Sequence, residues 1–204
     1  DSVTTLGLTG TELGTIATTN ALHIGNATSG AITITAPVAP SQATTRLTSG
    51  AGISSTAPAN TFTGTFLALV AGGAINVNTA VTNLAASTTA GGITVSNTIA
   101  GTLNVTTVDG LSGFLSTGTA INLTETTGAV TLSQPVNAGA STVAVTLNGA
   151  DKLLTNATTV SGTGGVIFTA DNMTLGGSIS AGAGVVTLTT KDPLQIINVG
   201  AGAT

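Results

Sequence analysis

The chain has 204 residues, enough for one domain or one elongated stack, and its composition excludes several classes of protein. Only 5% of the residues are charged and the formal net charge is -4, so its three cations cannot form a basic stripe for nucleic acid or an anionic membrane. The absence of cysteine excludes a disulfide scaffold and a thiolate metal site. No apolar run approaches the ~18 residues of a membrane-spanning helix, so we expect no membrane insertion by this segment.

The residue types that remain favour strands joined by tight turns. Thr, Val and Ile are abundant, and their branched side chains suit a pleated surface, whereas Gly and Asn suit the corners between strands. Only 2% of the residues are aromatic, which is too few to fill the wide core of a β-sandwich. The composition therefore predicts a narrow core of stacked aliphatic side chains.

A short apolar phrase returns along the chain and gives the primary indication of fold. Its central residue advances by 43, 18, 37 and 56 positions, which are close to two, one, two and three units of about 19 residues. Self-similarity at this period is typical of a solenoid, in which each repeat buries its apolar face only against its neighbours. We expect one all-β solenoid over residues 1–204, with about ten coils of roughly 20 residues. The phrase occupies residues 30–34, 73–77, 91–95, 128–132 and 184–188.

Within each phrase, apolar and small polar residues alternate, as in a strand with one buried face. The predicted inward residues form the structural core and are Ile32, Ile34, Ile75, Val77, Ile93, Val95, Val130, Leu132, Val186 and Leu188. The predicted outward residues form a surface ladder and are Thr33, Thr35, Asn76, Asn78, Thr94, Ser96, Thr131, Ser133, Thr187 and Thr189.

Two parts of the pattern depart from this regular repeat. Residues 41–65 are the least periodic and predict a longer loop. Neither end of the chain shows a polar cap or an amphipathic helix, and exposed strand edges invite further strands. We therefore expect a section of a longer repeat protein, or a unit that stacks end to end with copies of itself.

Two stretches resemble filamentous-haemagglutinin-like bacterial surface exoproteins, whose β-strand repeats occur in tandem. They are residues 5–13 followed by 21–32, and residues 168–177 followed by 179–188. The resemblance implies a right-handed parallel β-helix, secretion across the outer membrane, and a role as an extended adhesin or surface fibre. It implies no catalytic residue, because the repeat motif of the family contains none.

Few side chains offer chemistry. His23 is the single histidine, and Glu12, its nearest acidic neighbour, makes a weak pair for catalysis or metal binding. Asp109 and Glu125 lie about one coil apart in the sequence, so they could stack as a pair of carboxylates, as in β-helical polysaccharide-active enzymes. The simpler interpretation is that each is an isolated acidic residue in a turn. We expect no catalytic residue, metal or cofactor.

The function expected from these observations is structural. The segment is predicted to be a rigid, non-catalytic section of an extracellular bacterial surface fibre that supports adhesion. Its expected partners are copies of itself and host or matrix glycans or proteins. The alternatives are a carbohydrate- or ice-binding solenoid that uses the surface ladder, and a polysaccharide-active enzyme that uses Asp109.

Overall fold

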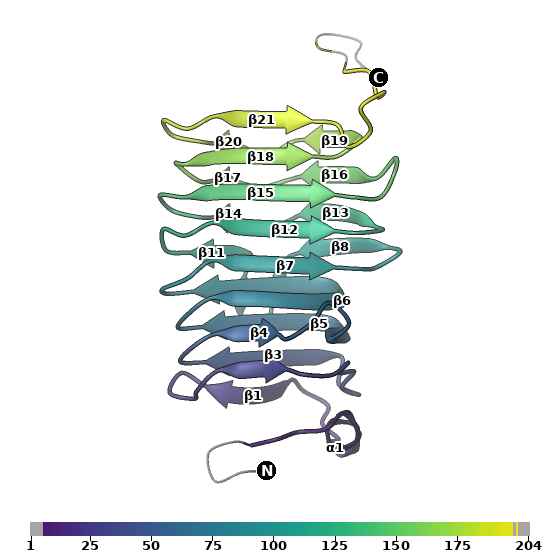
Figure 1. Cartoon of the computed structure of the whole chain (residues 1–204), viewed down its shortest axis with the longest axis vertical. Helices are drawn as coiled ribbons and strands as arrows, with labels where there is room; N and C mark the ends of the chain where they lie inside the picture. Colours follow the sequence, from purple (N-terminus) through teal and green to yellow (C-terminus); the bar gives the residue numbers. More distant parts are fainter. Residues whose placement is uncertain (1–5, 198, 200–204) are drawn as a thin grey trace.

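The computed structural model describes residues 6–197 and residue 199. The expected parallel β-solenoid is confirmed: one 19-stranded sheet winds around a common axis, and its strands pair in parallel with the coils before and after them (Figure 1). The β-hairpin of β9 (Thr107–Val108) and β10 (Leu111–Ser112) forms a separate two-stranded antiparallel sheet. The helix α1 (Gly10–Thr15) precedes the first coil.

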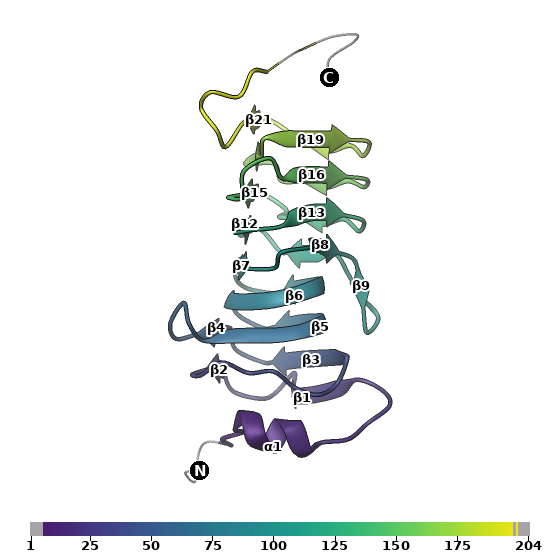
Figure 2. The ribbon, with the colours of Figure 1, turned by 90° about the vertical axis from the view of Figure 1, so that its right-hand side faces the viewer.

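The strands group into three faces that the chain visits in the same order in each coil (Figures 1 and 2). Face 1 is formed by β2 (Ile32–Ile34), β4 (Ile53–Ser55), the start of β6 (Ile75–Thr88), β7 (Ile93–Asn97), β12 (Ile121–Glu125), β15 (Thr142–Leu147), β18 (Gly165–Thr169) and β21 (Val186–Thr189). Face 2 is formed by the start of β5 (Thr61–Ala71), the middle of β6, β8 (Thr102–Val105), β13 (Ala129–Leu132), β16 (Leu153–Asn156) and β19 (Asn172–Leu175).

Face 3 closes the coil. It is formed by β1 (Leu22–Asn26), β3 (Thr44–Ser49), the ends of β5 and β6, β11 (Phe114–Ser116), β14 (Val136–Asn137), β17 (Val160–Ser161) and β20 (Ile179–Ser180). The long strands β5 and β6 turn the corners between faces without a break, and they pair with each other from Thr61 and Asn78 to Ala71 and Thr88, with one gap at Thr65.

Side chains on face 1 repeat at the same height in successive coils. The resulting column contains Ile32, Ile53, Ile75, Ile93, Ile121, Val143, Val166 and Val186. The described residues thus carry eight rungs on this face, against the ten or so expected. Measured on face 1, coil length varies from 18 residues between Thr79 and Asn97 to 28 between Asn97 and Glu125. The longest coil contains the β9–β10 hairpin.

The predicted inward residues occupy this interior with two exceptions. Those from Ile75 to Leu132 are between 0% and 2% exposed, Ile34 is 6% exposed, and Ile32 packs partly buried against them. Val186 and Leu188 point into the same columns but are 41% and 45% exposed. They belong to the last described rung, and no strand among the described residues stacks on it.

The predicted loop over residues 41–65 is wrong. This segment contains β3, β4 and the start of β5, each paired in parallel with its neighbours. The long excursion from the solenoid lies instead at β9–β10, whose tip Asp109-Gly110 has φ values of 49° and 76°. An Asp-Gly pair with both φ values positive is the favoured two-residue hairpin turn.

The expectation that neither end carries a cap is also wrong for the N-terminal end. The helix α1 lies below the first rung (Figures 1 and 2), and its Leu13 is 3% exposed. Thr9 and Glu12 form a capping box, in which Thr9 Oγ1 accepts from the Glu12 N–H and Glu12 Oε2 accepts from the Thr9 N–H. Those bonds from Thr9 also hold the pKa of Glu12 below its ordinary value.

Candidate functional site

The predicted surface ladder divides between two faces. Thr33, Asn76, Thr94 and Thr187 lie in one outward file of face 1, which also contains Ser54, Asn122, Ala144 and Ile167. Asn78, Ser96 and Thr189 lie in a second file with Thr124, Thr146 and Thr169. The first file is therefore interrupted by two apolar side chains, whereas the second is polar over six rungs.

Thr131 and Ser133 do not belong to this ladder, and their placement in the sequence-based prediction is wrong. Thr131 pairs with Asn104 and Thr155 on face 2. Its inward neighbours Val130 and Leu132 are buried on the same face. A phrase with the same local pattern thus occurs on two faces, since inward and outward alternation does not depend on which face a strand joins.

The clearest side-chain cluster joins His23, Arg46 and Asp109 on the outside of face 3. His23 and Arg46 are neighbours across β1 and β3. Asp109 Oδ2 lies 2.9 Å from His23 Nε2 and 3.4 Å from Arg46 Nη1, which also donates to the Asp109 carbonyl at 2.9 Å. The side chain of His23 remains 59% exposed, whereas those of Arg46 and Asp109 are 28% and 23% exposed.

The β9–β10 hairpin brings Asp109 to this position. The hairpin leaves the solenoid between β8 and β11 and lies along its side (Figure 2). Val108 packs on Ala68 and Ala85, and Leu111 joins this small cluster. Ala68 and Ala85 follow Arg46 in the same outward column. The apolar contacts and the contacts of Asp109 with Arg46 and His23 therefore fasten the hairpin to four successive strands.

We expect Asp109→Asn to loosen the hairpin while leaving the solenoid folded. Asparagine tolerates the positive φ of this position but loses the charge that attracts Arg46 and His23. Partly exposed ion pairs are worth less than about 1 kcal/mol, so the global melting temperature should change little. Amide hydrogen exchange in residues 107–112 should accelerate. Asp151→Asn is the matched control, since Asp151 is also a turn acid with a positive φ, of 57°. Unchanged exchange in the hairpin would contradict the assignment.

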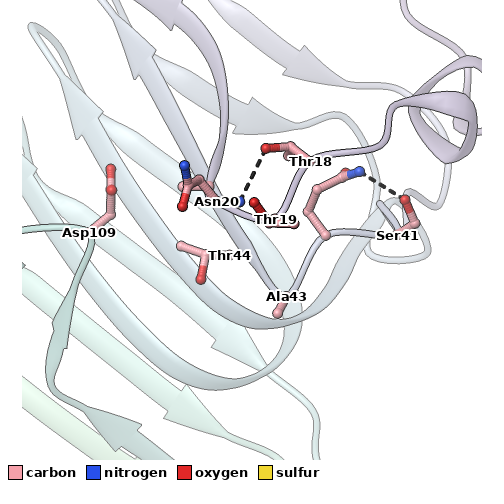
Figure 3. Close-up of a pocket in the computed structure, with 9 residues that line it drawn as sticks. Thr18, Thr19, Asn20, Ser41, Ala43, Thr44 and Asp109 are labelled. Atoms are coloured by element: carbon pink, nitrogen blue, oxygen red, sulfur yellow. Dashed lines mark hydrogen bonds between the residues drawn. The ribbon is translucent and has the colours of Figure 1, made fainter.

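A shallow hollow of about 470 Å³ opens beside this cluster (Figure 3). It is lined by residues 18–21, residues 41–44 and Asp109. Two hydrogen bonds join polar groups of its lining: Thr18 Oγ1 accepts from the Asn20 N–H, and Gln42 Nε2 donates to Ser41 Oγ. Gln42 Oε1, in contrast, is buried without a hydrogen-bond partner among the described residues. The one carboxylate at its edge is already paired with Arg46 and His23.

Asp109 and Glu125 are not a carboxylate pair, and Glu125 is not an isolated turn acid. Glu125 is fully buried at the corner between faces 1 and 2. Its Oε1 accepts backbone N–H groups from Ile99, Thr127 and Gly128, each at 3.1 Å, and its Oε2 accepts from Asn97 Nδ2 at 2.6 Å. These contacts engage both carboxylate oxygens in holding two coils together.

Asp171 has a similar role at a more exposed corner. Its carboxylate accepts N–H groups from Asp151 in the coil below and from Lys191 and Asp192 in the coil above. These bonds, that from Asp192 foremost, hold the pKa of Asp171 below its ordinary value of 3.8. A carboxyl group whose folded pKa is lowered stabilises the folded state above its unfolded pKa, and that stabilisation is lost as the pH falls through the folded pKa.

We therefore expect Asp171→Asn to lower the melting temperature at pH 7. The difference from the natural protein should shrink as the pH falls below about 4, where the carboxylate of the natural protein is also being protonated. Thermal unfolding followed by circular dichroism between pH 7 and pH 2 measures this. Asp151→Asn keeps the N–H donor to Asp171 and should melt like the natural protein. A difference that stays constant down to pH 2 would refute the role of the ionised carboxylate.

The sequence contained signals for two of these features. Thr9-x-x-Glu12 has the spacing of a capping box, and Asp109-Gly110 between apolar residues has the form of a hairpin turn. No sequence signal could have joined Asp109 to Arg46, which lies 63 residues away.

Within the described part of the chain, no three His, Asp or Glu side chains gather to hold a metal ion. No helix in that part is long and apolar enough to cross a membrane. No family model, no curated protein and no solved structure matches the chain.

Proposed function

We propose that this chain is a rigid, non-catalytic section of a secreted bacterial surface fibre, built as a right-handed parallel β-helix. The observation that carries the proposal is the aliphatic column of face 1, which runs without a polar interruption from Ile32 to Val186. Each coil is hydrogen-bonded along its strands to the next, so a pull on the axis acts on many backbone bonds at once.

The contacts of three acidic side chains within the protein support a mechanical role over a catalytic one. Glu125 and Asp171 accept backbone N–H groups between coils, and Asp109 fastens the hairpin. An acid or nucleophile for glycoside chemistry needs a second carboxylate within about 5–9 Å and access to substrate. Buried Glu125 lacks that access. The expected location on the cell surface and the expected adhesive role belong to the same proposal and rest on the resemblance described above.

Single-molecule force spectroscopy tests the mechanical role. The chain, tethered at both ends, should resist extension and then unfold in steps that each release about one coil, roughly 20 residues. The control is Ile93→Asp, which places a charge in the middle of the column and should lower the rupture force. Extension of the natural protein at the low force of an unfolded chain would reject the proposal.

A second candidate function is binding of a carbohydrate or of ice by the outer surface of face 1. The favouring observation is the file of small polar side chains that runs from Asn78 through Thr124 to Thr189. Ala144 and Ile167 interrupt the neighbouring file, which weakens a regular Thr-x-Thr match to ice. A glycan array and a thermal-hysteresis assay separate these functions. Binding to a glycan, or thermal hysteresis, that is lost in the Thr146→Lys variant would favour a binding function over a purely mechanical role.

A further inference from the structure

One turn of the solenoid contains the single Asn-Gly pair of the chain. Asn148 and Gly149 lie in the turn that joins β15 to β16, at the corner between faces 1 and 2 (Figure 1). The Asn148 N–H donates to the Glu125 carbonyl at 2.8 Å. The Asp151 N–H donates to Asp171 Oδ2 at 3.1 Å. The turn is therefore fastened to the coil below at its start and to the coil above near its end.

The peptide between these two bonds is free. Among the described residues, no hydrogen bond forms to Gly149, to Ala150 or to the side chain of Asn148. Asn148 is exposed and Gly149 is partly exposed. Glycine is required here by packing, because a Cβ at position 149 would lie 2.8 Å from Lys152 Cγ and 3.1 Å from the Thr127 carbonyl oxygen. The packing of the corner thus places after Asn148 the one residue type that has no side chain to shield its backbone nitrogen.

This arrangement puts a nucleophile next to an electrophile. When Gly149 N attacks Asn148 Cγ, the N–Cγ bond forms and the Cγ–Nδ2 bond breaks, and ammonia leaves with the proton that Gly149 N gives up. The product is a five-membered succinimide ring. Water then breaks one of the two bonds from the ring carbonyls to the nitrogen. One cleavage gives aspartate, and the other gives isoaspartate, in which the main chain runs through Cβ and Cγ. Water is the one co-reactant.

Two other asparagines in exposed positions lack this combination. Asn26 Oδ1 accepts from the N–H and the Oγ1 of Thr28, each at 2.8 Å. Asn137 Oδ1 accepts from the Gly139 N–H at 2.7 Å. Both asparagines are followed by alanine, whose methyl group hinders the approach of its nitrogen. Asn148 therefore differs from them both in the freedom of its side chain and in the residue that follows it.

We propose that Asn148 is a site of spontaneous deamidation, and that the reaction loosens this corner of the solenoid. Isoaspartate adds one main-chain carbon to a turn that is held at both ends by neighbouring coils. The bonds of Asn148 to Glu125 and of Asp151 to Asp171 then cannot both keep their geometry. Either product also adds a negative charge to a chain whose net charge is already -4. The proposal concerns the ageing of one coil and does not depend on the fibre role.

Peptide mapping by mass spectrometry, after incubation of the folded full chain in mildly alkaline buffer, tests the assignment. The peptide with Asn148 should gain the mass difference between an amide and an acid and should separate into two isomers. Peptides with Asn26 and Asn137 should keep their mass. Asn148→Gln should lose the conversion, because its longer side chain would have to close a six-membered ring. The matched control Asn137→Gln should leave the conversion at Asn148 unchanged.

A parallel incubation in denaturing urea gives the conversion of the unfolded chain. If Asn148 stayed intact in the folded protein until the unfolded chain had converted, the proposal would be overturned, since the corner would then hold the two reacting atoms apart. Equal conversion at Asn26 or Asn137 would overturn the assignment to this turn. Hydrogen exchange tests the consequence: the amides of residues 148–152 should exchange faster in the isolated isoaspartate form than in Asn148→Gln. Equal exchange in the two would refute the loosening of the corner.

Discussion

Replacing Ile93 with aspartate is expected to destabilise the solenoid by more than about 4 kcal/mol, because it buries a carboxylate without a partner. Ile93 is fully buried and lies between Ile75 and Ile121 in the column of face 1. An aspartate there either keeps its charge among aliphatic side chains or opens the coil to admit water. Both outcomes break the contact between the coils on either side.

The measurement is thermal unfolding followed by circular dichroism, with Thr94→Asp as the control. Thr94 is the next residue of the same strand, and its side chain is exposed. Both variants gain one aspartate and have the same net charge, so a large difference between them reports whether the new carboxylate points into the core or outward. In a stack where each coil contacts only its neighbours, hydrogen exchange should also show the damage spreading from β7 in both directions. Equal melting temperatures for the two variants would disprove the inward position of Ile93.

Replacing Glu125 with alanine is expected to cost more than about 3 kcal/mol, because each buried donor left without an acceptor costs about 1–3 kcal/mol. The substitution leaves four buried or partly buried donors without their acceptor: the N–H groups of Ile99, Thr127 and Gly128, and Asn97 Nδ2. Asn97 is itself fixed, because its Oδ1 accepts from Thr79 Oγ1 at 2.7 Å and from the Val81 N–H at 3.0 Å. The network therefore connects three successive coils at one corner.

Glutamine at position 125 separates the loss of the side chain from the loss of its charge. Glu125→Gln keeps one oxygen for the three backbone N–H groups but turns its amide nitrogen towards Asn97 Nδ2, so two donors face each other. We expect a smaller loss than for alanine. The double variant Asn97→Asp with Glu125→Gln restores a donor opposite an acceptor, at the expense of the bond from Asn97 Nδ2 to the Val81 carbonyl.

Denaturant unfolding of the natural protein, Asn97→Asp, Glu125→Gln and the double variant forms a double-mutant cycle. A favourable coupling of more than about 0.5 kcal/mol is expected for residues in one hydrogen-bond network. Additive effects would show that Asn97 and Glu125 do not act together. A Glu125→Ala variant as stable as the natural protein would show that the corner does not depend on this carboxylate.

The sequence alone predicted the winding and the direction of most core side chains. Ile75, Val77, Ile93 and Val95 could be assigned because alternation along a strand is local, and because the phrase that contains them recurs along the chain. The repeated burial of the same residue type at the same height then follows from stacking at one strand spacing.

The sequence did not determine on which face a phrase lies. The phrases at residues 91–95 and 128–132 look alike, yet Ile93 belongs to face 1 and Val130 to face 2. That difference depends on the number of residues in each corner and on the pairing register, which involve neighbouring coils. For the same reason, the predicted ladder contained Thr131 in place of Thr124.

What the sequence by itself determined is thus the strand alternation and the aliphatic core, since both depend on residues close together in the chain. Only the tertiary structure decided the partners of its few charged groups and the state of its ends. Asp109 reaches Arg46 across 63 residues because a hairpin folds back over three strands, and Glu125 is buried because its corner lies beneath the next coil. Val186 and Leu188 have the pattern of core residues but are exposed, because burial in a solenoid requires a neighbour above as well as below.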